Sequence, residues 1–207
     1  MELCIGTKLL SSRQNDLAAE LALVERCRNQ DAEAFGKIVD AYQHRVFGFV
    51  RRMVSDQDEA ADVSQEVFIR AYQGMVRFDG RSSLRTWLFR IAYNLCIDRS
   101  RKIDRTPMET RIEAVAEDEQ PMEFPDARWD PETMLMTDEL VSMVDAALES
   151  MSEKLRSVLL LHDKEDMAYD EIAQTLNLPI GTVKSRLFLA RNHLQQALSE
   201  YVQGRGN

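Results

Sequence analysis

The chain has 207 residues, of which 44% are hydrophobic and 29% charged, and its net charge is −9. This length and apolar content are enough for one or two domains with buried cores, which excludes a disordered chain. Eight glycines and five prolines are too few for a turn-rich β-sandwich or a collagen-like repeat, so an all-α protein is favoured. The widely spaced Cys4, Cys27 and Cys96 favour a reducing compartment, and no stretch is apolar over the roughly 20 residues that a membrane span needs. We therefore expect a cytoplasmic protein without membrane insertion.

Charge is distributed unevenly along the chain. Residues 76–111 carry a net charge of +5 and residues 179–207 carry +3, whereas residues 112–153 carry −12. The local potential, and not the total charge, decides whether a phosphate backbone can be approached. The sequence is therefore compatible with a nucleic-acid-binding protein that has two basic segments on either side of an acidic one.

The N-terminal half has the hydrophobic periodicity of helices. Asp31 is a candidate N-cap, and Asp56 followed by Glu59 has the spacing of a capping box. Ser82 or Ser83 can cap a later helix. Apolar residues recur at helical spacing in four segments: 17–24, 35–53, 60–71 and 84–95.

The middle of the chain differs in composition from both ends. Residues 106–136 combine prolines and many carboxylates with no sustained hydrophobic period, which predicts an acidic, flexible linker. Helical spacing resumes at residues 140–151 and 155–162, and two shorter helices follow. We expect an all-α protein with an N-terminal extension (1–15), a first helical domain (16–105), the linker (106–136) and a second helical domain (137–203).

The segment 169–186 has the pattern of a helix-turn-helix within the second domain. Ala173 is small where the two helices would cross, and Asn177 stands where the turn needs a positive φ. Pro179 ends the first helix, and Val183 supplies the apolar contact that fixes the crossing angle. The apolar side of the second helix would continue through Ile180, Leu187, Ala190 and Leu194. Its opposite side would present residue types that read DNA grooves, namely Thr182, Lys184, Ser185, Arg186, Phe188 and Arg191.

Three motifs resemble a known family. They are DVSQEVFIRAY at residues 62–72, RFDGRSSLRTWLFRIAYN at 77–94 and GTVKSRLFLAR at 181–191. Their order and separation resemble the extracytoplasmic-function group of sigma factors in the sigma-70 family, over nearly the whole chain except residues 1–15 and the linker. Leu189 departs from the family pattern, in which a basic residue often stands there. The resemblance implies an alternative sigma factor for a stress response, which directs promoter recognition, DNA melting and transcription initiation and is held inactive by an anti-sigma factor.

The resemblance also implies binding surfaces for core RNA polymerase. The helix of residues 57–73 would dock on the clamp coiled coil of the largest polymerase subunit, and the second domain on the flap of the second-largest subunit. Carboxylates beside an aromatic side chain suit such an interface, in which Phe68 would be an exposed apolar anchor. A solvated acidic face is the alternative. The candidate polymerase-binding residues are Asp58, Asp62, Gln65, Glu66 and Phe68.

The basic segment after this helix is the candidate binding region for the minus-10 element of the promoter. Basic and aromatic side chains together suit unpaired bases, because stacking can offset the cost of opening a duplex. The resemblance implies that Asn94, with Phe78 and the loop, lines a pocket for a flipped base, whereas the spacing of Trp87 favours a core role. The candidate minus-10 residues are Arg77, Phe78, Gly80, Arg81, Ser82, Ser83, Arg85 and Asn94, and the helix-turn-helix would bind the minus-35 element of promoter DNA.

Two other classes of function compete with this interpretation. An ordinary helix-turn-helix regulator with an N-terminal sensing domain would explain the second domain, but it leaves the motifs at 62–94 unexplained. A metal-dependent nuclease lacks support, because the chain has no nucleophile with a base at suitable spacing and no Glu-x-x-His pair or other metal-ligand pattern. We therefore expect no catalytic residue, no metal and no cofactor.

Overall fold

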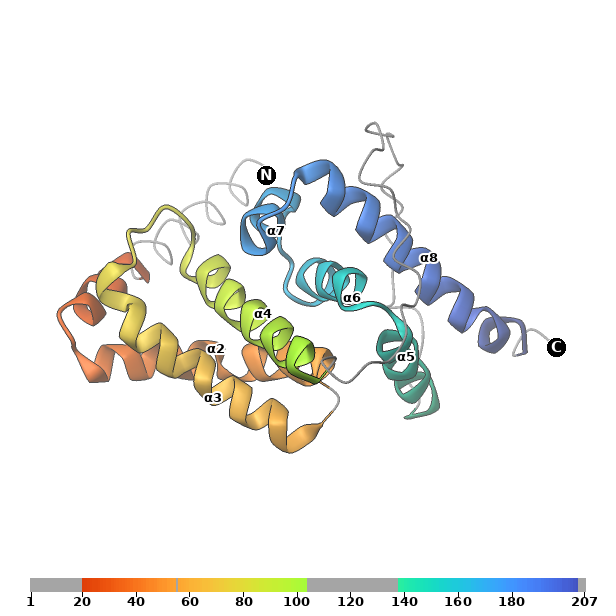
Figure 1. The fold of residues 1–207 in the computed structure, drawn as a ribbon, viewed down its shortest axis with the longest axis horizontal. Helices are drawn as coiled ribbons and strands as arrows, with labels where there is room; N and C mark the ends of the chain where they lie inside the picture. The colour runs from red at the N-terminus through yellow and green to blue at the C-terminus, as the bar shows by residue number, and fades with distance from the viewer. Residues whose placement is uncertain (1–19, 55, 104–137, 205–207) are drawn as a thin grey trace, which may run out of the picture.

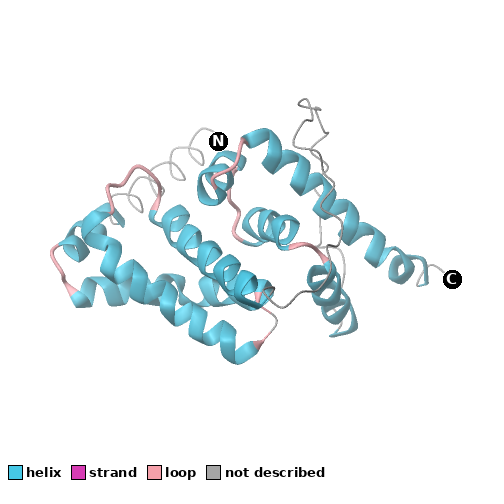
Figure 2. Cartoon of the chain, viewed as in Figure 1, coloured by secondary structure: helices cyan, strands magenta, loops and turns pink. Residues whose placement is uncertain are grey.

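The computed structural model describes residues 20–54, 56–103 and 138–204. Within these ranges the regular elements are helices and no strand occurs, which confirms the all-α class (Figure 1; Figure 2). The expected extension 1–15 and linker 106–136 lie outside the described residues. After a helix over residues 20–28, the elements are α2 (Ala32–Met53), α3 (Gln57–Gly74), a 3-10 turn (Met75–Arg77), α4 (Leu84–Ile103), α5 (Asp138–Ser150), α6 (Glu153–Leu159), a π-helical turn (Leu160–Lys164), α7 (Tyr169–Leu176) and α8 (Ile180–Gly204).

Side-chain caps begin three helices of the N-terminal domain at the predicted positions. Asp31 and Asp56 each accept a hydrogen bond from the backbone N–H three residues later, at 3.0 Å and 2.8 Å. Of the two candidate serines, Ser83 is the cap of α4, because its Oγ lies 3.1 Å from the N–H of Thr86. Each cap satisfies a donor that the first turn of a helix leaves without an intrahelical partner.

The core of this domain follows the predicted hydrophobic stripes. Ala60, Val63, Val67 and Ala71 of α3 are buried, as are Leu84, Leu88 and Leu95 of α4. Phe89 is also buried and packs edge-on against Phe49 of α2, with ring centroids 5.5 Å apart. Trp87 is half-buried against Phe78, at 4.9 Å between centroids, in agreement with its expected packing role.

The helix-turn-helix forms as predicted, with one exception. Asn177 adopts the left-handed conformation, with φ 54° and ψ 54°, and the Ala173 carbonyl accepts the N–H of Leu178 at 3.0 Å across the turn. Val183 is fully buried, which fixes the crossing of α7 and α8. Ile180 was predicted to join this apolar side but is 47% exposed, because it is the first residue of α8 and lies outside the packed part of the helix. Leu187, Ala190 and Leu194 are buried as predicted.

The two domains pack against each other. Helix α4 contacts α7, and α2 contacts α5 and α6. Helix α4 therefore lies between the other helices of the first domain and the helix-turn-helix (Figure 1). One hydrophobic cluster contains Phe49 and Val50 of the first domain together with Leu148 and Val158 of the second. The sequence predicts two lobes separated by a linker, and periodicity within each lobe does not reveal that their surfaces meet.

A buried arginine, for which the sequence predicts no such role, holds part of this junction. Arg156 is 7% exposed, and its Nη1 donates to the carbonyl oxygen of Arg52 at the end of α2, at 2.9 Å. Its Nη2 donates to the carbonyls of Glu149 and Met151, at 2.8 Å and 2.9 Å. Arg156 therefore joins the ends of α2, α5 and α6 through backbone acceptors.

Candidate nucleic-acid and protein interfaces

One face of α3 is exposed along the length of the helix. The exposed residues of this face follow one another at steps of four and three residues, a spacing that places them on the same side of the helix. Its first half is polar, whereas its second half carries Ile69 and Tyr72, which are 50% and 43% exposed, and the spacing continues to Val76, at 57%. Exposed apolar residues beside carboxylates are typical of a protein interface. We call this face the α3 stripe: Asp58, Asp62, Gln65, Ile69, Tyr72 and Val76.

The α3 stripe overlaps only in part with the predicted polymerase-binding set. Asp58, Asp62 and Gln65 belong to both. Phe68 was predicted to be an exposed anchor, but it is half-buried and packs against the hydrophobic core, because it borders the buried side of α3. Glu66 is half-buried and pairs with Arg70 at 2.7 Å, one helical turn away. The exposed apolar half was not predicted, although its spacing from Asp58 is readable from the sequence.

The loop between α3 and α4 exposes two of its predicted arginines. Arg77 and Arg81 are exposed, and Arg81 pairs with Asp79 at 3.0 Å. Gly80 has φ +74°, a conformation that favours glycine, so it allows the chain to turn between these residues. Ser82 is half-buried, and Ser83 is exposed although its hydroxyl caps α4.

Phe78 shapes the loop from inside. Its ring is 6% exposed and packs on the ring of Trp87. The Trp87 ring also lies close to Gly74, where a Cβ atom would be 3.1 Å from Cζ2 of Trp87. The guanidinium of Arg28 donates to the Phe78 carbonyl, with Nε at 2.9 Å. The family resemblance implies that Phe78 lines a pocket for a base, but in this structure the ring is nearly buried against Trp87 and is not exposed for stacking.

The structure separates two other predicted minus-10 residues. Asn94 is exposed on α4, whereas Arg85 is half-buried against α7. Nine residues are two and a half turns of an α-helix, so these side chains leave opposite sides of α4. Asn94 and Arg85 therefore cannot line one small pocket.

The predicted recognition residues of α8 form two groups. Thr182, Ser185 and Arg186 are half-buried on one side of the helix, and Lys184, Phe188 and Arg191 follow one another at steps of four and three residues on another side. In the second group Lys184 is exposed, and so is the large apolar side chain of Phe188, at 38%. The Lys184 ammonium lies 5.8 Å from the centre of the Tyr169 ring, a cation–π contact with α7.

Arg191 has a partner within the second domain. Its Nη2 lies 2.8 Å from Oδ1 of Asp163 and 3.2 Å from Nδ1 of His162. Burial acts to raise the pKa of Asp163, but the hydrogen bonds from His162 and Arg191 outweigh it, so this pKa lies below its ordinary value of 3.8. A DNA contact by Arg191 therefore has to compete with this ion pair.

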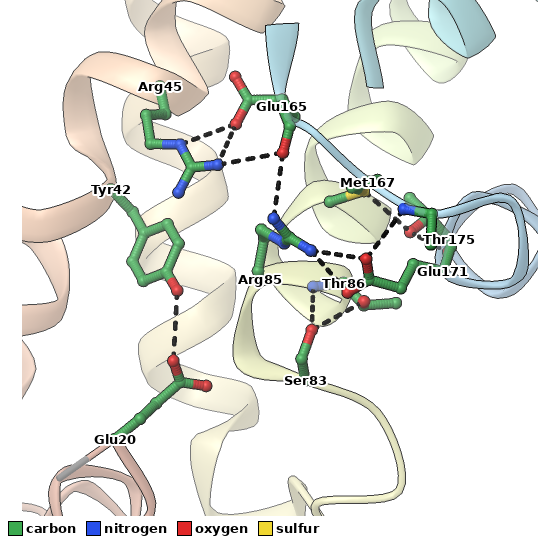
Figure 3. Close-up of polar contacts among 11 residues, drawn as sticks. Glu20, Tyr42, Arg45, Ser83, Arg85, Thr86, Glu165, Met167, Glu171 and Thr175 are labelled. Atoms are coloured by element: carbon green, nitrogen blue, oxygen red, sulfur yellow. Dashed lines mark hydrogen bonds and ion pairs between the residues drawn. The ribbon is translucent and has the colours of Figure 1, made fainter. Parts of the chain in front are cut away.

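A polar cluster joins the two domains (Figure 3). Arg45 of α2 pairs with Glu165 at 2.7 Å, and Arg85 of α4 pairs with Glu171 of α7 at 2.6 Å. On the first domain's side, the Tyr42 hydroxyl donates to Glu20 at 3.5 Å. Burial, and then the charge of Glu20, raise the pKa of Tyr42 to about 12. These groups are positioned as ion pairs and hydrogen bonds, and their arrangement has no nucleophile beside a base.

Neither a metal site nor a membrane helix is found in the described parts of the chain. Residues 20–54, 56–103 and 138–204 contain no group of three His, Cys, Asp or Glu side chains that could hold a metal ion. Among the helices in these ranges, none has the length and apolarity that crossing a membrane requires.

Comparison with known proteins identifies relatives for both domains. The family model Sigma-70 region 2 matches residues 38–106, and Sigma-70 region 4 matches residues 142–194. The RNA polymerase sigma-H factor of Pseudomonas aeruginosa is 38% identical over 184 residues, which are 87% of this chain and 94% of that protein. The ECF RNA polymerase sigma-E factor of Escherichia coli K12 is 35% identical over 182 residues, which are 87% of this chain and 95% of that protein.

Solved structures agree with this assignment. The sigma factor RpoE from Bartonella quintana, solved in complex with the anti-sigma factor NepR, has a TM-score of 0.60 and 26% identity, and covers 80% of this chain and 96% of its own. CnrH, solved with the cytosolic domain of CnrY, has a TM-score of 0.64 and 23% identity over 88% of this chain and 98% of its own, which supports the fold alone. With the exposed α3 stripe, the basic loop and the helix-turn-helix in one chain, these matches show that the protein belongs to the extracytoplasmic-function group of the sigma-70 family and is a non-enzymatic sigma factor that directs transcription initiation.

Proposed function

We propose that this sigma factor divides its work among three surfaces: the α3 stripe binds core RNA polymerase, α4 with its preceding loop opens the minus-10 element, and the helix-turn-helix binds the minus-35 element. The observation that carries this proposal is the position of the surfaces within the two matched regions, with the α3 stripe, the loop and α4 inside region 2 and α8 beginning inside region 4. The chain acts in the cytoplasm, where core polymerase and its template are found.

Polymerase binding uses both halves of the α3 stripe. Asp58, Asp62 and Gln65 supply polar contacts to the clamp coiled coil of the largest subunit, and the apolar half around Ile69 and Tyr72 supplies the buried centre of the interface. The second domain docks on the flap of the second-largest subunit. The support for this step is the exposure of apolar side chains in line with carboxylates on one helix.

Promoter opening uses the exposed loop arginines and Asn94. Arg77 and Arg81 hold the phosphates of the separated strand, while Asn94 offers hydrogen bonds to the edge of an unpaired base. Arg85 lies on the other side of α4 and contacts the DNA backbone after the two domains separate.

Duplex binding uses the first turns of α8. Thr182, Ser185 and Arg186 lie near its N-terminus, where a recognition helix meets base edges, and Lys184 and Phe188 lie beside them. Arg191 contributes once its pair with Asp163 is exchanged for a phosphate.

An anti-sigma factor holds the chain inactive until a stress signal releases it. The support is the likeness to the Bartonella quintana sigma factor, whose structure was solved with an anti-sigma factor. The inhibitor of this chain would cover the α3 stripe, because exposed apolar patches mark interaction sites and a partner bound there would exclude polymerase from the same surface.

Run-off transcription tests the proposed function directly. Purified chain is added to purified core polymerase on restriction fragments of the source genome, and core polymerase alone is the control. A sigma factor produces discrete transcripts that start at defined positions. An ordinary helix-turn-helix regulator or a nuclease produces none, and that result would contradict the proposal.

A further inference from the structure

Leu189 of α8 is an apolar side chain on the side of the helix that carries Ser185 and Arg186. It follows Ser185 by four residues and Arg186 by three, which is the spacing that places side chains on one side of a helix. Val183 and Leu187 point away from this side and are buried in the core. Leu189 is therefore placed with the residues that the proposed function assigns to base edges.

Packing within the chain does not account for an apolar residue at this position. Leu189 is half-buried, yet it lies outside both hydrophobic clusters that the described parts of the chain form, and outside the partly buried side chains packed against them. One of these clusters extends over both domains and includes Leu187 and Ala190, the close neighbours of Leu189 in the sequence. The apolar surface that Leu189 exposes is therefore available to a partner outside the chain.

Duplex DNA offers one apolar group to such a side chain in the major groove. Thymine carries a C5-methyl group there, whereas the edges of adenine, guanine and cytosine offer hydrogen-bond donors and acceptors. Leucine makes no hydrogen bond, but contact of its methyl groups with that of thymine removes apolar surface of both from water. A polar base edge that is covered by leucine loses its water without gaining a partner, so the other bases are disfavoured at the same place.

The distance from Arg186 to Leu189 along the helix limits which base pair Leu189 can reach. Three residues of an α-helix rise about 4.5 Å. Successive base pairs of a duplex are about 3.4 Å apart. The two side chains therefore reach base pairs that are one or two steps apart in the groove.

We propose that Leu189 is a specificity-determining residue, which selects a thymine in the minus-35 element by contact with the C5-methyl group. This inference rests on the proposed function, because it requires α8 to lie in the major groove of that element. It goes further by assigning one base, through one group of that base, to one side chain. The chain then prefers T·A to C·G at a base pair one or two steps from the pair that Arg186 contacts.

The first experiment removes the methyl group from the DNA. Holoenzyme is assembled from core polymerase and the full chain, and it is titrated against a fluorescent promoter duplex whose minus-35 element is located from the start of its run-off transcript. Each thymine of this element is replaced in turn by deoxyuridine, which lacks only the C5-methyl group. At one thymine we expect the affinity to fall about fourfold, the factor that burial of one methyl-sized group supplies.

Variants of the chain connect this effect to Leu189. Leu189→Ala should bind the thymine and deoxyuridine duplexes equally, and so should Leu189→Asn, which is similar in size but polar. Leu189→Met keeps an apolar contact and should retain the preference. Val141→Ala truncates an exposed apolar side chain of α5 and is the matched control, which should keep the fourfold difference. Circular dichroism verifies that each variant is helical.

The second experiment adds a methyl group. The sensitive T·A pair is replaced by C·G, and the cytosine is then replaced by 5-methylcytosine. The added methyl group should increase the affinity of the wild-type holoenzyme about fourfold and leave that of Leu189→Ala unchanged.

The outcomes separate this inference from the proposed function. If deoxyuridine weakens binding at no position, or weakens it equally for the wild type and Leu189→Ala, then Leu189 is a solvated surface residue and the inference is wrong. When Arg186→Ala weakens duplex binding in the same assay, that failure leaves the proposed function intact. If Arg186→Ala binds the duplex as tightly as the wild type, the proposed role of α8 is contradicted, and the role of Leu189 with it.

Discussion

Arg45 of α2 and Glu165, which follows the π-helical turn, are 120 positions apart in the chain, yet Arg45 Nη2 lies 2.7 Å from Glu165 Oε2. Glu165 is 5% exposed, whereas the Arg45 side chain is 40% exposed. Burial raises the pKa of the Glu165 carboxyl above its ordinary value of 4.5, although the charge and hydrogen bond of Arg45 act to lower it. The pair joins the two domains, but the cost of burying the carboxylate exceeds the attraction.

Glu165→Gln should therefore raise the free energy of unfolding at neutral pH. The native state binds the Glu165 proton more tightly than the unfolded chain does, so the ionised form destabilises the native state, and this cost disappears as the pH falls through the raised pKa towards 4.5. The advantage of the variant should be largest at neutral pH and vanish below the ordinary pKa. Urea unfolding at a series of pH values, followed by circular dichroism, measures it.

Asp163→Asn is the opposite case and serves as the control. Because the pKa of Asp163 is lowered below 3.8, its ionised form stabilises the native state, and this contribution is lost as the pH falls through the lowered pKa. The asparagine variant should be less stable than the wild type at neutral pH. A Glu165→Gln protein that is also less stable at neutral pH would show that the attraction of Arg45 exceeds the cost of burial.

Substitutions in the α3 stripe should weaken polymerase binding without unfolding the chain. Asp62→Ala with Gln65→Ala removes polar contacts, and Ile69→Ser with Tyr72→Ser removes the exposed apolar half. Each pair should weaken binding by about 2 kcal/mol or more if it contains interface hot spots. Co-purification with core polymerase measures the loss, and circular dichroism verifies the helical content.

Gln196→Ala, on an exposed position of α8, is a control for the α3 variants. Phe68→Ala is unsuitable, because Phe68 packs against the core and its loss would leave a cavity. If both double variants co-purify with core polymerase as the wild type does, the α3 stripe is a solvated surface and not the polymerase interface.

Arg156→Met should destabilise the junction of the two domains. Its guanidinium donates to three backbone carbonyls, and methionine leaves these acceptors without their donors. A hydrogen bond to a charged group contributes about 1.5–3 kcal/mol, so thermal unfolding should shift by a corresponding amount. A variant with wild-type thermal stability would show that water replaces the guanidinium at no cost.

Cys27 and Cys96 should be inert in the native protein. Each is 3% exposed, and burial raises the pKa of Cys27 and raises that of Cys96 to about 12. In a Cys4→Ser background, a thiol reagent at mildly alkaline pH should modify neither cysteine until urea is added. Rapid modification of the native chain would contradict the packing role of these side chains.

Features that depend on local chemistry could be predicted from the sequence. The caps at Asp31, Asp56 and Ser83 need only a short polar side chain before a helix. The left-handed turn at Asn177 follows from its position between two amphipathic helices. The buried stripe of α3 follows from periodicity alone.

Features that depend on the meeting of distant surfaces could not be predicted. Periodicity distinguishes the buried from the exposed side of α4, but it does not show that α7 covers Arg85. The same holds for Arg156, whose acceptors are carbonyl groups without a sequence signature. The family resemblance places Phe78 at a base pocket, and nothing in the local sequence shows that its ring packs against Trp87.

The central claim is that the two domains divide promoter binding and opening between them. Run-off transcription on one promoter, supplied as a duplex and as a template premelted at the minus-10 element, tests it with Asn94→Ala and Arg186→Ala. Arg186→Ala should weaken binding to the duplex, by about 1–3 kcal/mol if the arginine contacts guanine in the major groove, and should leave opening intact.

In the proposed function Asn94 contacts a base that is unpaired only after opening, so Asn94→Ala should bind the duplex normally but yield few transcripts from it. Its transcript yield should recover on the premelted template. If Asn94→Ala impairs duplex binding as much as Arg186→Ala does, and premelting restores nothing, the division of work between the domains is contradicted.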